Sequence, residues 1–316
     1  MTDAMKFFPL PSPRKSQEAV IREIQKAYSD NYKFVILEAP VGSGKSAIAI
    51  TIARWLQSAH ILTPRKTLQD QYYDDFKEHI VLMKGRSSYI CTKDEEDDFH
   101  EQVIKWVQSG KSPSPGRVHV DCFNSPCRNK EYVQRKCTTL RNRTCPYKMA
   151  VEVAEDNDII VHNFHSFLYQ YNFAMRFNKR EVLIVDEAHE MEGILRDFAT
   201  VEFVVPKLIP ENLQPDLSKQ DLEYWVNYFQ TPELQPRSEV RREEYNASLE
   251  SLRKCAEYGT GYIARTSSQE HLRTTTFNFI PIQVGKEANN LIFTCSDKVL
   301  LMSGTIYNKD VYCRSL

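Results

Sequence analysis

Residues 34–46, with the sequence F-V-I-L-E-A-P-V-G-S-G-K-S, constrain the fold of this chain more than any other stretch. The apolar run at 34–37 is rich in β-forming residues and ends at a cluster of Pro and Gly, which predicts a buried strand. A helical pattern follows over residues 47–56. Strand, loop and helix in this order match the spacing of a phosphate loop, although Ala39 stands where the strict pattern has Gly. We therefore predict a nucleoside-triphosphate site.

The residue types in this loop suit a phosphate ligand. Gly42 and Gly44 allow the backbone to curl so that its N–H groups point at an anion, and the following helix directs its positive N-terminus to the same place. Lys45 is placed to reach the β- and γ-phosphates, and the Ser46 hydroxyl to hold Mg²⁺. The alternative is a plain Gly-containing turn, which the flanking strand and helix make a poor interpretation. The predicted contact residues are Pro40, Val41, Gly42, Ser43, Gly44, Lys45 and Ser46.

A second signal, V-L-I-V-D-E-A-H at residues 182–189, ends an apolar strand with two carboxylates. Because α/β folds bind ligands at the carboxyl ends of their strands, Asp186 is suited to hold Mg²⁺ and Glu187 to orient and deprotonate an attacking water. The alternative is an acidic turn that caps a helix, but the pairing with a phosphate loop favours the chemical interpretation. A third signal, S-G-T at residues 303–305, follows another apolar strand and alone would be only a turn.

Length, charge and cysteine content limit the remaining possibilities. A chain of 316 residues predicts two domains, or one domain with large insertions. The formal charge of −1 gives no global nucleic-acid signal, so any such surface must be local. No apolar run approaches membrane-spanning length and M-T-D-A-M-K is no signal peptide, so we expect an intracellular protein, cytoplasmic or nuclear, without membrane contact. In that reducing compartment, a local group of the eight cysteines favours a metal site over disulfides.

Apolar strands alternate with helical segments along much of the chain, which predicts an α/β fold with a parallel sheet flanked by helices. The predicted strands are residues 34–37, 60–63, 159–161, 182–185, 279–282 and 299–302. Two segments interrupt this pattern. Residues 91–146 lack periodicity and contain several cysteines next to a basic stretch, whereas residues 205–275 are polar with helical spacing and predict a helical insertion.

Together these segments resemble superfamily 2 helicases of the DEAH type, and the cysteine-bearing insertion narrows the resemblance to the XPD/DinG family of iron–sulfur DNA helicases. The matching segments are E-A-P-V-G-S-G-K-S, L-T-P-R-K-T-L-Q-D-Q, K-G-R-S-S-Y-I-C, C-P-Y-K-M-A, D-E-A-H and M-S-G-T. The resemblance implies a RecA-like motor domain and ATP-dependent 5′→3′ translocation on single-stranded or forked DNA. The implied boundaries are 1–84, 148–200 and 278–316 for the motor domain, 85–147 for an iron–sulfur insertion and 201–277 for a helical arch.

The resemblance also assigns roles to individual residues. The residues carried over are Arg14 and Gln17 for reading adenine, Thr63, Pro64 and Arg65 for touching the DNA backbone, and His189, Ser303, Gly304 and Thr305 for coupling hydrolysis to DNA binding. For Gln17 a solvated helix position, and for Arg65 an ordinary surface charge, remain the alternatives.

Four thiolates would hold a cubane [4Fe-4S] cluster, and the resemblance implies that they are Cys91, Cys127, Cys137 and Cys145, with Cys122 left spare. Zinc in a Cys₄ site is the physical competitor, but zinc sites usually show close C-x₂₋₄-C pairs, and no two of the four assigned cysteines are so close in the sequence. Unligated core thiols fit poorly with the polar, basic surroundings.

The cysteine-bearing insertion also carries the local basic surface. Residues 128–148 contain seven basic residues, Arg135 and Lys136 among them, against one acidic residue. With Tyr89 and other tyrosines nearby, this stretch combines phosphate-neutralising charge with stacking faces, so we expect it to contact DNA. An ordinary solvated face is the alternative.

The chain stops eleven residues after Thr305, whereas helicases of the resembling family continue into a second motor domain whose arginines complete the ATP site. We expect that domain to be absent here and to act, if at all, in trans. The rival from another class is a nucleotide- and DNA-binding fragment without helicase activity of its own. A nucleotide kinase is a third candidate, but it leaves D-E-A-H, S-G-T and the cysteines unexplained.

Overall fold

The computed structural model of the chain describes residues 2–89, 145–205, 209, 211–219, 221–258, 261–269, 274–306, 310 and 312. The chain divides into two compact units. Unit 1 comprises Met1–Met191 and Leu291–Tyr307, and unit 2 comprises Glu192–Asn290 and Asn308–Leu316. None of the helices that the structure describes combines the length and apolar character needed to cross a membrane.

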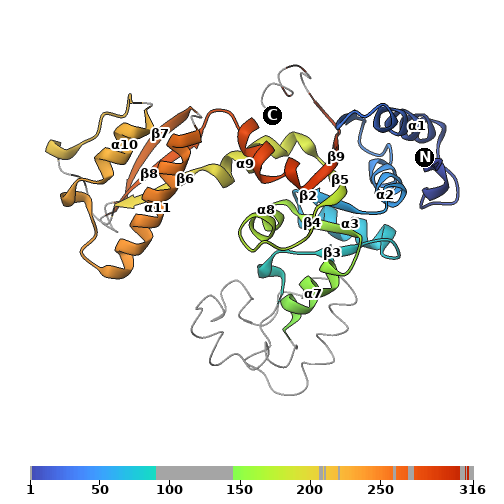
Figure 1. Cartoon of the computed structure of the whole chain (residues 1–316), viewed down its shortest axis with the longest axis horizontal. Coiled ribbons are helices and arrows are strands. Elements are labelled where there is room, and N and C mark those ends of the chain that lie inside the picture. Colours follow the sequence, from blue (N-terminus) through green and yellow to red (C-terminus); the bar gives the residue numbers. More distant parts are fainter. Residues whose placement is uncertain are drawn as a thin grey trace. The chain divides into compact units, whose positions relative to one another are not determined.

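Unit 1 is built on a six-stranded sheet with the order β1-β9-β5-β2-β4-β3, in which every neighbouring pair is parallel (Figure 1). The strands are β1 (Phe34–Glu38), β2 (Ala59–Thr63), β3 (Val81–Met83), β4 (Ile159–Asn163), β5 (Arg180–Val185) and β9 (Ser296–Ser303). All five residues of β2 are buried, as expected for a central strand covered on both faces. The predicted α/β fold with a parallel sheet is therefore confirmed.

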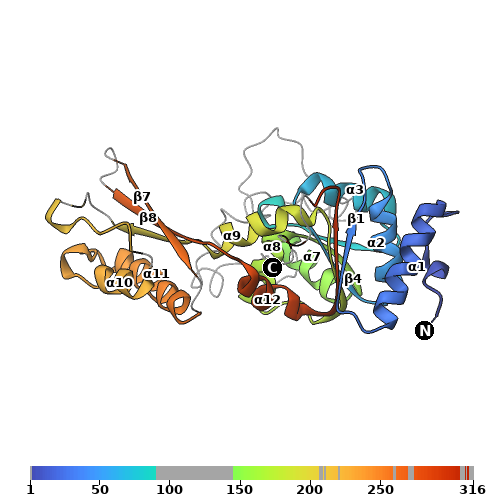
Figure 2. The same ribbon diagram turned by 90° about the horizontal axis from the view of Figure 1, so that it is seen from above.

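Helices cover both faces of this sheet (Figure 2). They are α1 (Lys15–Ser29), α2 (Lys45–Trp55), α3 (Lys66–Phe76), α7 (Pro146–Glu155) and α8 (Phe164–Asn172). Val161 of β4 belongs to the main core with residues of α1, α2 and α3, whereas its neighbour Ile160 packs in a second cluster with α7. The period of two along the strand sends alternate side chains to opposite faces. In α1 the buried positions Gln17, Ile21, Ile24 and Tyr28 recur at helical spacing.

Two buried histidines face each other within this sheet. The ring atoms His60 Nδ1 and His162 Nε2 lie 3.1 Å apart, and His60 Nε2 lies 3.0 Å from the carbonyl oxygen of Asn178. Because a carbonyl only accepts, His60 carries its proton on Nε2, and His162 must then donate from its own Nε2. This leaves His162 Nδ1 buried without a hydrogen-bond partner in the described structure. Burial lowers the pKa of His60 to about 4 and that of His162 well below its ordinary value.

Acid is therefore expected to destabilise unit 1 through this pair. Both histidines have a folded pKa below their unfolded value of about 6.5, so their stabilisation is present above that pH and is lost as pH falls toward 4. For His60 alone, the free energy of unfolding should drop by about 2 kcal/mol at pH 5. Urea unfolding at pH 7.5 and 5 should show a smaller pH effect in His60→Asn than in wild type. The exposed His165→Asn is the control, and equal pH effects in wild type and His60→Asn would contradict the account.

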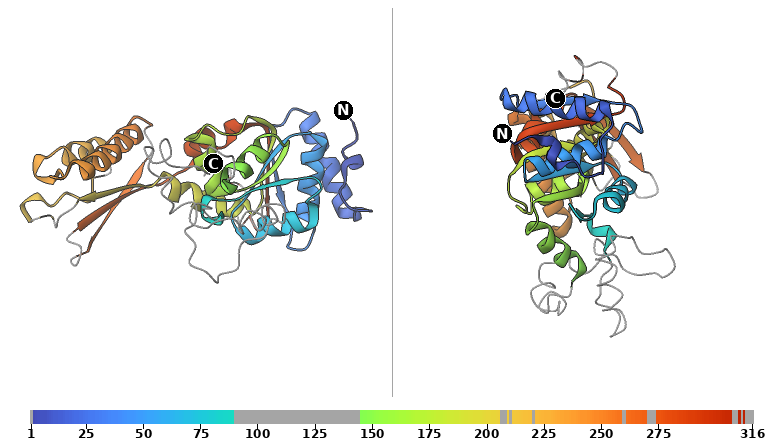
Figure 3. Two further views of the ribbon diagram at one scale, coloured as in Figure 1. Left: turned by 90° about the horizontal axis from the view of Figure 1, so that it is seen from below. Right: turned by 90° about the vertical axis from the view of Figure 1, so that its right-hand side faces the viewer.

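Unit 2 contains a three-stranded antiparallel sheet with the order β6-β8-β7. Its elements are β6 (Val201–Val205), α10 (Leu222–Phe229), α11 (Glu239–Tyr258), β7 (Tyr262–Gln269) and β8 (Thr274–Pro281), with most of α9 (Met191–Ala199) and α12 (Gly285–Leu291). The two helices α10 and α11 lie on one side of the sheet (Figure 3). Aromatic rings fill the space between, and those of Phe203 and Phe229 stack with centroids 3.9 Å apart.

Residues 201–277, predicted as a helical insertion, contain strands as well as helices. The helical spacing was interpreted correctly, because α10 and α11 occupy it. The strands were missed, because β8 buries Thr275, Phe277 and Phe279 at a period of two that its threonines and asparagine obscure. The strand predicted at 279–282 is the end of β8, and it pairs with β6 and β7 rather than joining the parallel sheet.

Candidate functional site

The predicted chemical segments meet at one edge of the sheet in unit 1. Strand register pairs Glu38 at the end of β1 with Ser303 at the end of β9. On the other side, Val185 at the end of β5 pairs with Leu301 of β9 and with Leu62 of β2. The phosphate loop, S-G-T, D-E-A-H and the T-P-R segment therefore follow four adjacent strands at their carboxyl ends, which is where parallel α/β sheets bind ligands.

The phosphate loop has a backbone that only glycine adopts easily. Gly42 and Gly44 have φ angles of +80° and +83°, and Gly44 caps the N-terminus of α2. The Lys45 ammonium, with only 8% of the residue exposed, donates to the carbonyl oxygen of Ala39 at 3.1 Å. A Cβ atom added at Gly304 would lie 3.8 Å from the Lys45 ammonium, so the glycine of S-G-T keeps the space beside Lys45 open. Curled backbone, helix N-terminus and lysine together suit a phosphate.

Arg14 and Gln17, predicted to read adenine, contact the loop itself. The Arg14 guanidinium donates to the carbonyl oxygen of Gly42 at 2.8 Å, and the Gln17 amide donates to that of Ser43 at 3.3 Å. A Cβ added to Gly44 would lie 2.2 Å from Gln17 Nε2, so the glutamine packs directly on this glycine. Both residues thus support the phosphate loop, and their role toward adenine stays a prediction.

Asp186 is held rigidly at the end of β5. Its residue is 2% exposed, its Oδ1 accepts the backbone N–H of Glu187 at 3.0 Å, and its Oδ2 accepts the Tyr72 hydroxyl at 2.8 Å. Burial raises the pKa of the Asp186 carboxyl, and these two hydrogen bonds act in the opposite direction. Burial raises the pKa of the Tyr72 hydroxyl well above its ordinary value, and the nearby Ser46 side chain acts in the opposite direction. The two predicted Mg²⁺ ligands, Asp186 and Ser46, therefore both lie close to the Tyr72 hydroxyl.

The residues that follow Asp186 connect β5 with β9. Glu187 adopts a left-handed backbone with φ 52° and ψ 48°, a strained conformation for a non-glycine residue that is typical of functional sites. His189 Nδ1 lies 2.9 Å from Ser303 Oγ and 3.4 Å from a Glu187 carboxylate oxygen. The Ser303 hydroxyl donates to the carbonyl oxygen of Thr305, so the hydrogen bond from His189 requires a proton on Nδ1. The structure thus joins D-E-A-H and S-G-T directly.

The T-P-R segment is only partly exposed. The Thr63 residue is fully buried and its hydroxyl donates to the carbonyl oxygen of His162, whereas the Arg65 side chain is 70% exposed and forms an ion pair with Glu190 at 2.7 Å. Beside this pair lies an open hollow of about 370 Å³. It is lined by Pro64, Arg65, Thr67, Leu68, Gln71, Glu187, His189 and Glu190. Of the three residues of this segment predicted to touch the DNA backbone, Pro64 and Arg65 can do so from this surface.

Most of the predicted cluster insertion lies outside the described residues, including Cys91, Cys122, Cys127, Cys137, Arg135 and Lys136. Of its flanks, Cys145 is half-buried at the N-cap of α7, and the Tyr89 and Tyr147 rings meet edge to face with centroids 5.5 Å apart. Tyr89 is 6% exposed and lies in a small core, which argues against the predicted base-stacking contact at this residue. Within the described part of the chain, no group of three or more His, Cys, Asp or Glu side chains is placed to hold a metal ion.

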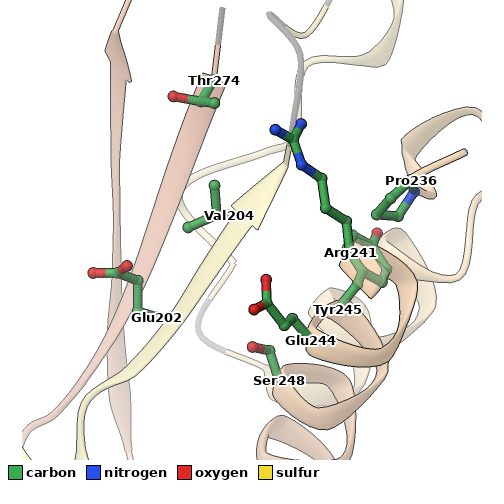
Figure 4. A pocket seen from close by; sticks show the side chains of 8 residues that line it. All are labelled: Glu202, Val204, Pro236, Arg241, Glu244, Tyr245, Ser248 and Thr274. Atoms are coloured by element: carbon green, nitrogen blue, oxygen red, sulfur yellow. The ribbon is translucent and has the colours of Figure 1, made fainter. Parts of the chain in front are cut away.

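Unit 2 has a separate hollow of about 490 Å³ between β6 and α11 (Figure 4). It is lined by Glu202, Val204, Pro236, Arg241, Glu244, Tyr245, Ser248 and Thr274. None of the residues predicted to be functional lies there, and the structure gives this hollow no chemical assignment.

Sequence reasoning missed two residues of the unit 1 site, Tyr72 and Glu190. The spacing of Gln69, Tyr72 and Phe76 predicts the buried face of α3, so the burial of Tyr72 had a signal. The sequence held no such signal for the neighbours of the Tyr72 hydroxyl, because Ser46 and Asp186 belong to other elements, distant from Tyr72 in the sequence.

Comparisons with known proteins give relatives of the same kind. The family described as "Type III restriction enzyme, res subunit" matches residues 10–200. The probable ATP-dependent helicase MJ0942 of Methanocaldococcus jannaschii is 23% identical over 249 residues, which cover 75% of this chain and 36% of that protein. The chain thus spans about a third of the length of this curated relative.

Two solved structures also match. One, described as "XPD_APO", is 14% identical with a TM-score of 0.44, and the match covers 94% of this chain and 54% of that chain. The other, S. tokodaii Xpd4, is 13% identical with a TM-score of 0.43, and the match covers 93% and 59%. TM-scores of this size support no conclusion about function. The family match is decisive, because residues 10–200 are more than half of the chain. The chain therefore belongs to the family of the type III restriction enzyme res subunit, a family of ATP-dependent, helicase-type enzymes.

Proposed function

We propose that this chain is the first motor domain of an ATP-dependent DNA helicase of the XPD/DinG type, which translocates 5′→3′ on single-stranded DNA. One observation carries the proposal: the phosphate loop, S-G-T, D-E-A-H and the T-P-R segment follow four adjacent parallel strands at one edge of the sheet. Nucleotide-binding, hydrolytic and nucleic-acid-facing groups are thereby side by side, as coupling between them requires.

The phosphate loop binds and orients ATP. Backbone N–H groups around Gly42 and Gly44 cradle the phosphates, and Lys45 donates to the β- and γ-phosphate oxygens. Ser46 and Asp186 fit a magnesium ion, because both supply hard oxygen ligands at the edge of the sheet where the phosphate loop and D-E-A-H meet. Mg²⁺ bound together with ATP would neutralise negative charge on the phosphate oxygens.

Hydrolysis needs an oriented water, and Glu187 is the residue suited to hold it and accept its proton. The left-handed backbone at Glu187 turns the chain sharply after β5, and the next residues bring His189 onto Ser303. A change at the γ-phosphate position would act on Glu187 and reach β9 through this contact. We propose this route for coupling hydrolysis to movement on DNA.

The open hollow beside Arg65 is the proposed contact with the DNA backbone. Arg65 is held there by an exposed ion pair with Glu190, and pairs of this kind contribute at most about 1 kcal/mol. A DNA phosphate can replace Glu190 at little cost, because the guanidinium donates to a phosphate as well as to a carboxylate and makes one contact with Glu190, from Nη2 to Oε1 at 2.7 Å.

A [4Fe-4S] cluster in residues 85–147 is the remaining part of the proposal, with Cys91, Cys127, Cys137 and Cys145 as ligands. The contact between Tyr89 and Tyr147 supports it, because it ties together the two ends of the segment that carries the cysteines. Free thiolates persist in reducing compartments, so an intracellular location is proposed with the cluster.

The rival function is a nucleotide- and DNA-binding fragment that acts only with a second motor domain in trans. We predict that the 316-residue chain alone binds ATP and single-stranded DNA, hydrolyses ATP slowly and does not unwind a duplex. The reason is that an arginine finger contributes about 10³–10⁵ in rate in related enzymes, and we expect a partner to supply it. The measurement is steady-state ATP hydrolysis with and without single-stranded DNA, together with strand displacement on a forked duplex.

Glu187→Gln provides the matched control for this experiment, because it keeps the size of the side chain but removes the base. It should bind ATP like wild type and lose the residual hydrolysis. DNA-stimulated hydrolysis on adding a candidate second domain supports the helicase over the binding fragment. Strand displacement by this chain alone would show that no further domain is needed, and absence of ATP binding would refute the proposed function.

A further inference from the structure

Tyr72 has a position that nothing in the proposed function explains. It lies on α3, is fully buried, and its hydroxyl donates to Asp186 Oδ2 at 2.8 Å, with the Ser46 side chain nearby. Asp186 and Ser46 are the residues proposed to hold Mg²⁺. The hydroxyl therefore lies where it holds the orientation of one proposed metal ligand, Asp186.

The geometry at Asp186 leaves room for a metal. An ionised carboxylate offers about four lone-pair directions, and the structure uses one on each oxygen, for Glu187 N–H and for Tyr72. The remaining lone pairs stay available, while rotation of the carboxylate is blocked. Removing the Tyr72 hydroxyl would free Oδ2 and allow the carboxylate to turn in a site that is 2% exposed.

The plain alternative is that a buried tyrosine hydroxyl simply takes the nearest partner. Tyr28 speaks against this, because it belongs to the same core, is 1% exposed, and its hydroxyl has no hydrogen-bond partner in the described structure. This core thus accommodates a tyrosine hydroxyl without a partner. The hydrogen bond of Tyr72 to a proposed metal ligand is therefore more than the burial of its hydroxyl requires.

We propose that Tyr72 is a positioning residue for the magnesium ion that accompanies ATP. Acting through Asp186, it fixes the orientation of that carboxylate before the metal binds. The inference rests on the proposed function, since it needs the ATP site assigned above. Partners that orient metal ligands typically contribute about 10–100-fold to metal affinity, and this is the size of effect expected for Tyr72.

The test measures metal binding directly with Mn²⁺ as the probe. The full chain is saturated with a non-hydrolysable ATP analogue and titrated with Mn²⁺, and the free ion is followed by electron paramagnetic resonance. Tyr72→Phe keeps the ring in the core and removes only the hydroxyl, so Mn²⁺ affinity should fall by about 10–100-fold. Affinity for the analogue in EDTA should stay at the wild-type value, because the phosphate loop is untouched.

Tyr28→Phe is the matched control, since it removes an equally buried hydroxyl from the same core and should leave Mn²⁺ affinity unchanged. Asp186→Asn distinguishes a failure of the role given to Tyr72 from a failure of the proposed metal site. If Asp186→Asn weakens Mn²⁺ binding but Tyr72→Phe does not, the inference is wrong and the proposed function stands. If Asp186→Asn also binds Mn²⁺ like wild type, the proposed metal site itself fails. Tighter Mn²⁺ binding by Tyr72→Phe, or loss of analogue binding in EDTA, would likewise overturn the role given to Tyr72.

Discussion

Replacing Lys45 by alanine should abolish measurable ATP binding while the fold of the chain is kept. Lys45 is the first residue of α2, and its ammonium lies beside the loop with a hydrogen bond to Ala39 and open space at Gly304. With ATP bound, that ammonium donates to two phosphate groups. Charge-assisted hydrogen bonds contribute about 1.5–3 kcal/mol each, so losing two weakens binding by roughly 10²–10⁴-fold.

Titration with a fluorescent ATP analogue measures this effect. Alanine is a good helix former and most of α2 is buried, so circular dichroism should show an intact fold in Lys45→Ala. Lys26→Ala, an exposed lysine in the last turn of α1, makes the same change of charge and should bind the analogue like wild type. Unchanged affinity in Lys45→Ala would mean that the phosphates lie elsewhere.

The arrangement of the proposed nucleotide site was predictable because its signals are local in the sequence. Each chemical segment follows an apolar strand directly, and parallel strands bring their carboxyl ends to one edge by geometry alone. The positions of Lys45, Asp186 and His189 follow from this rule. The family match confirms the helicase-type enzyme that these segments indicated.

Contacts between distant segments were not predictable in this way. The hydrogen bonds of Tyr72, the ion pair between Arg65 and Glu190, and the burial of Tyr89 all depend on which strands and helices become neighbours. Strand order is itself non-local, since β9 near the end of the chain inserts between β1 and β5. In unit 2 the sequence showed the helices but not β8, whose core-facing positions include Thr275 among the aromatic residues.

The second large effect concerns iron. Anaerobically purified protein should be brown and contain about four irons per chain, as a cubane cluster requires. Cys91, Cys127, Cys137 and Cys145 should each be needed. The segment between the first and last of these cysteines has little apolar material to fold around, so cluster binding should act as folding energy for it. ATP binding should survive the loss of any ligand, because the phosphate loop belongs to the parallel sheet.

Cys145→Ser gives the sharpest version of this experiment. Cys145 is the N-cap of α7, and serine is among the best N-cap residues, so the substitution removes a thiolate while supporting the helix. Iron should be lost and the far-UV spectrum of the α/β unit retained. The variants Cys122→Ser and Cys255→Ser should contain as much iron as wild type. For Cys255→Ser the reason is that Cys255 lies in α11 of unit 2, outside the cysteine-bearing insertion. Zinc instead of iron by elemental analysis would refute the cluster, and loss of iron in Cys122→Ser with retention in Cys127→Ser would overturn the choice of ligands.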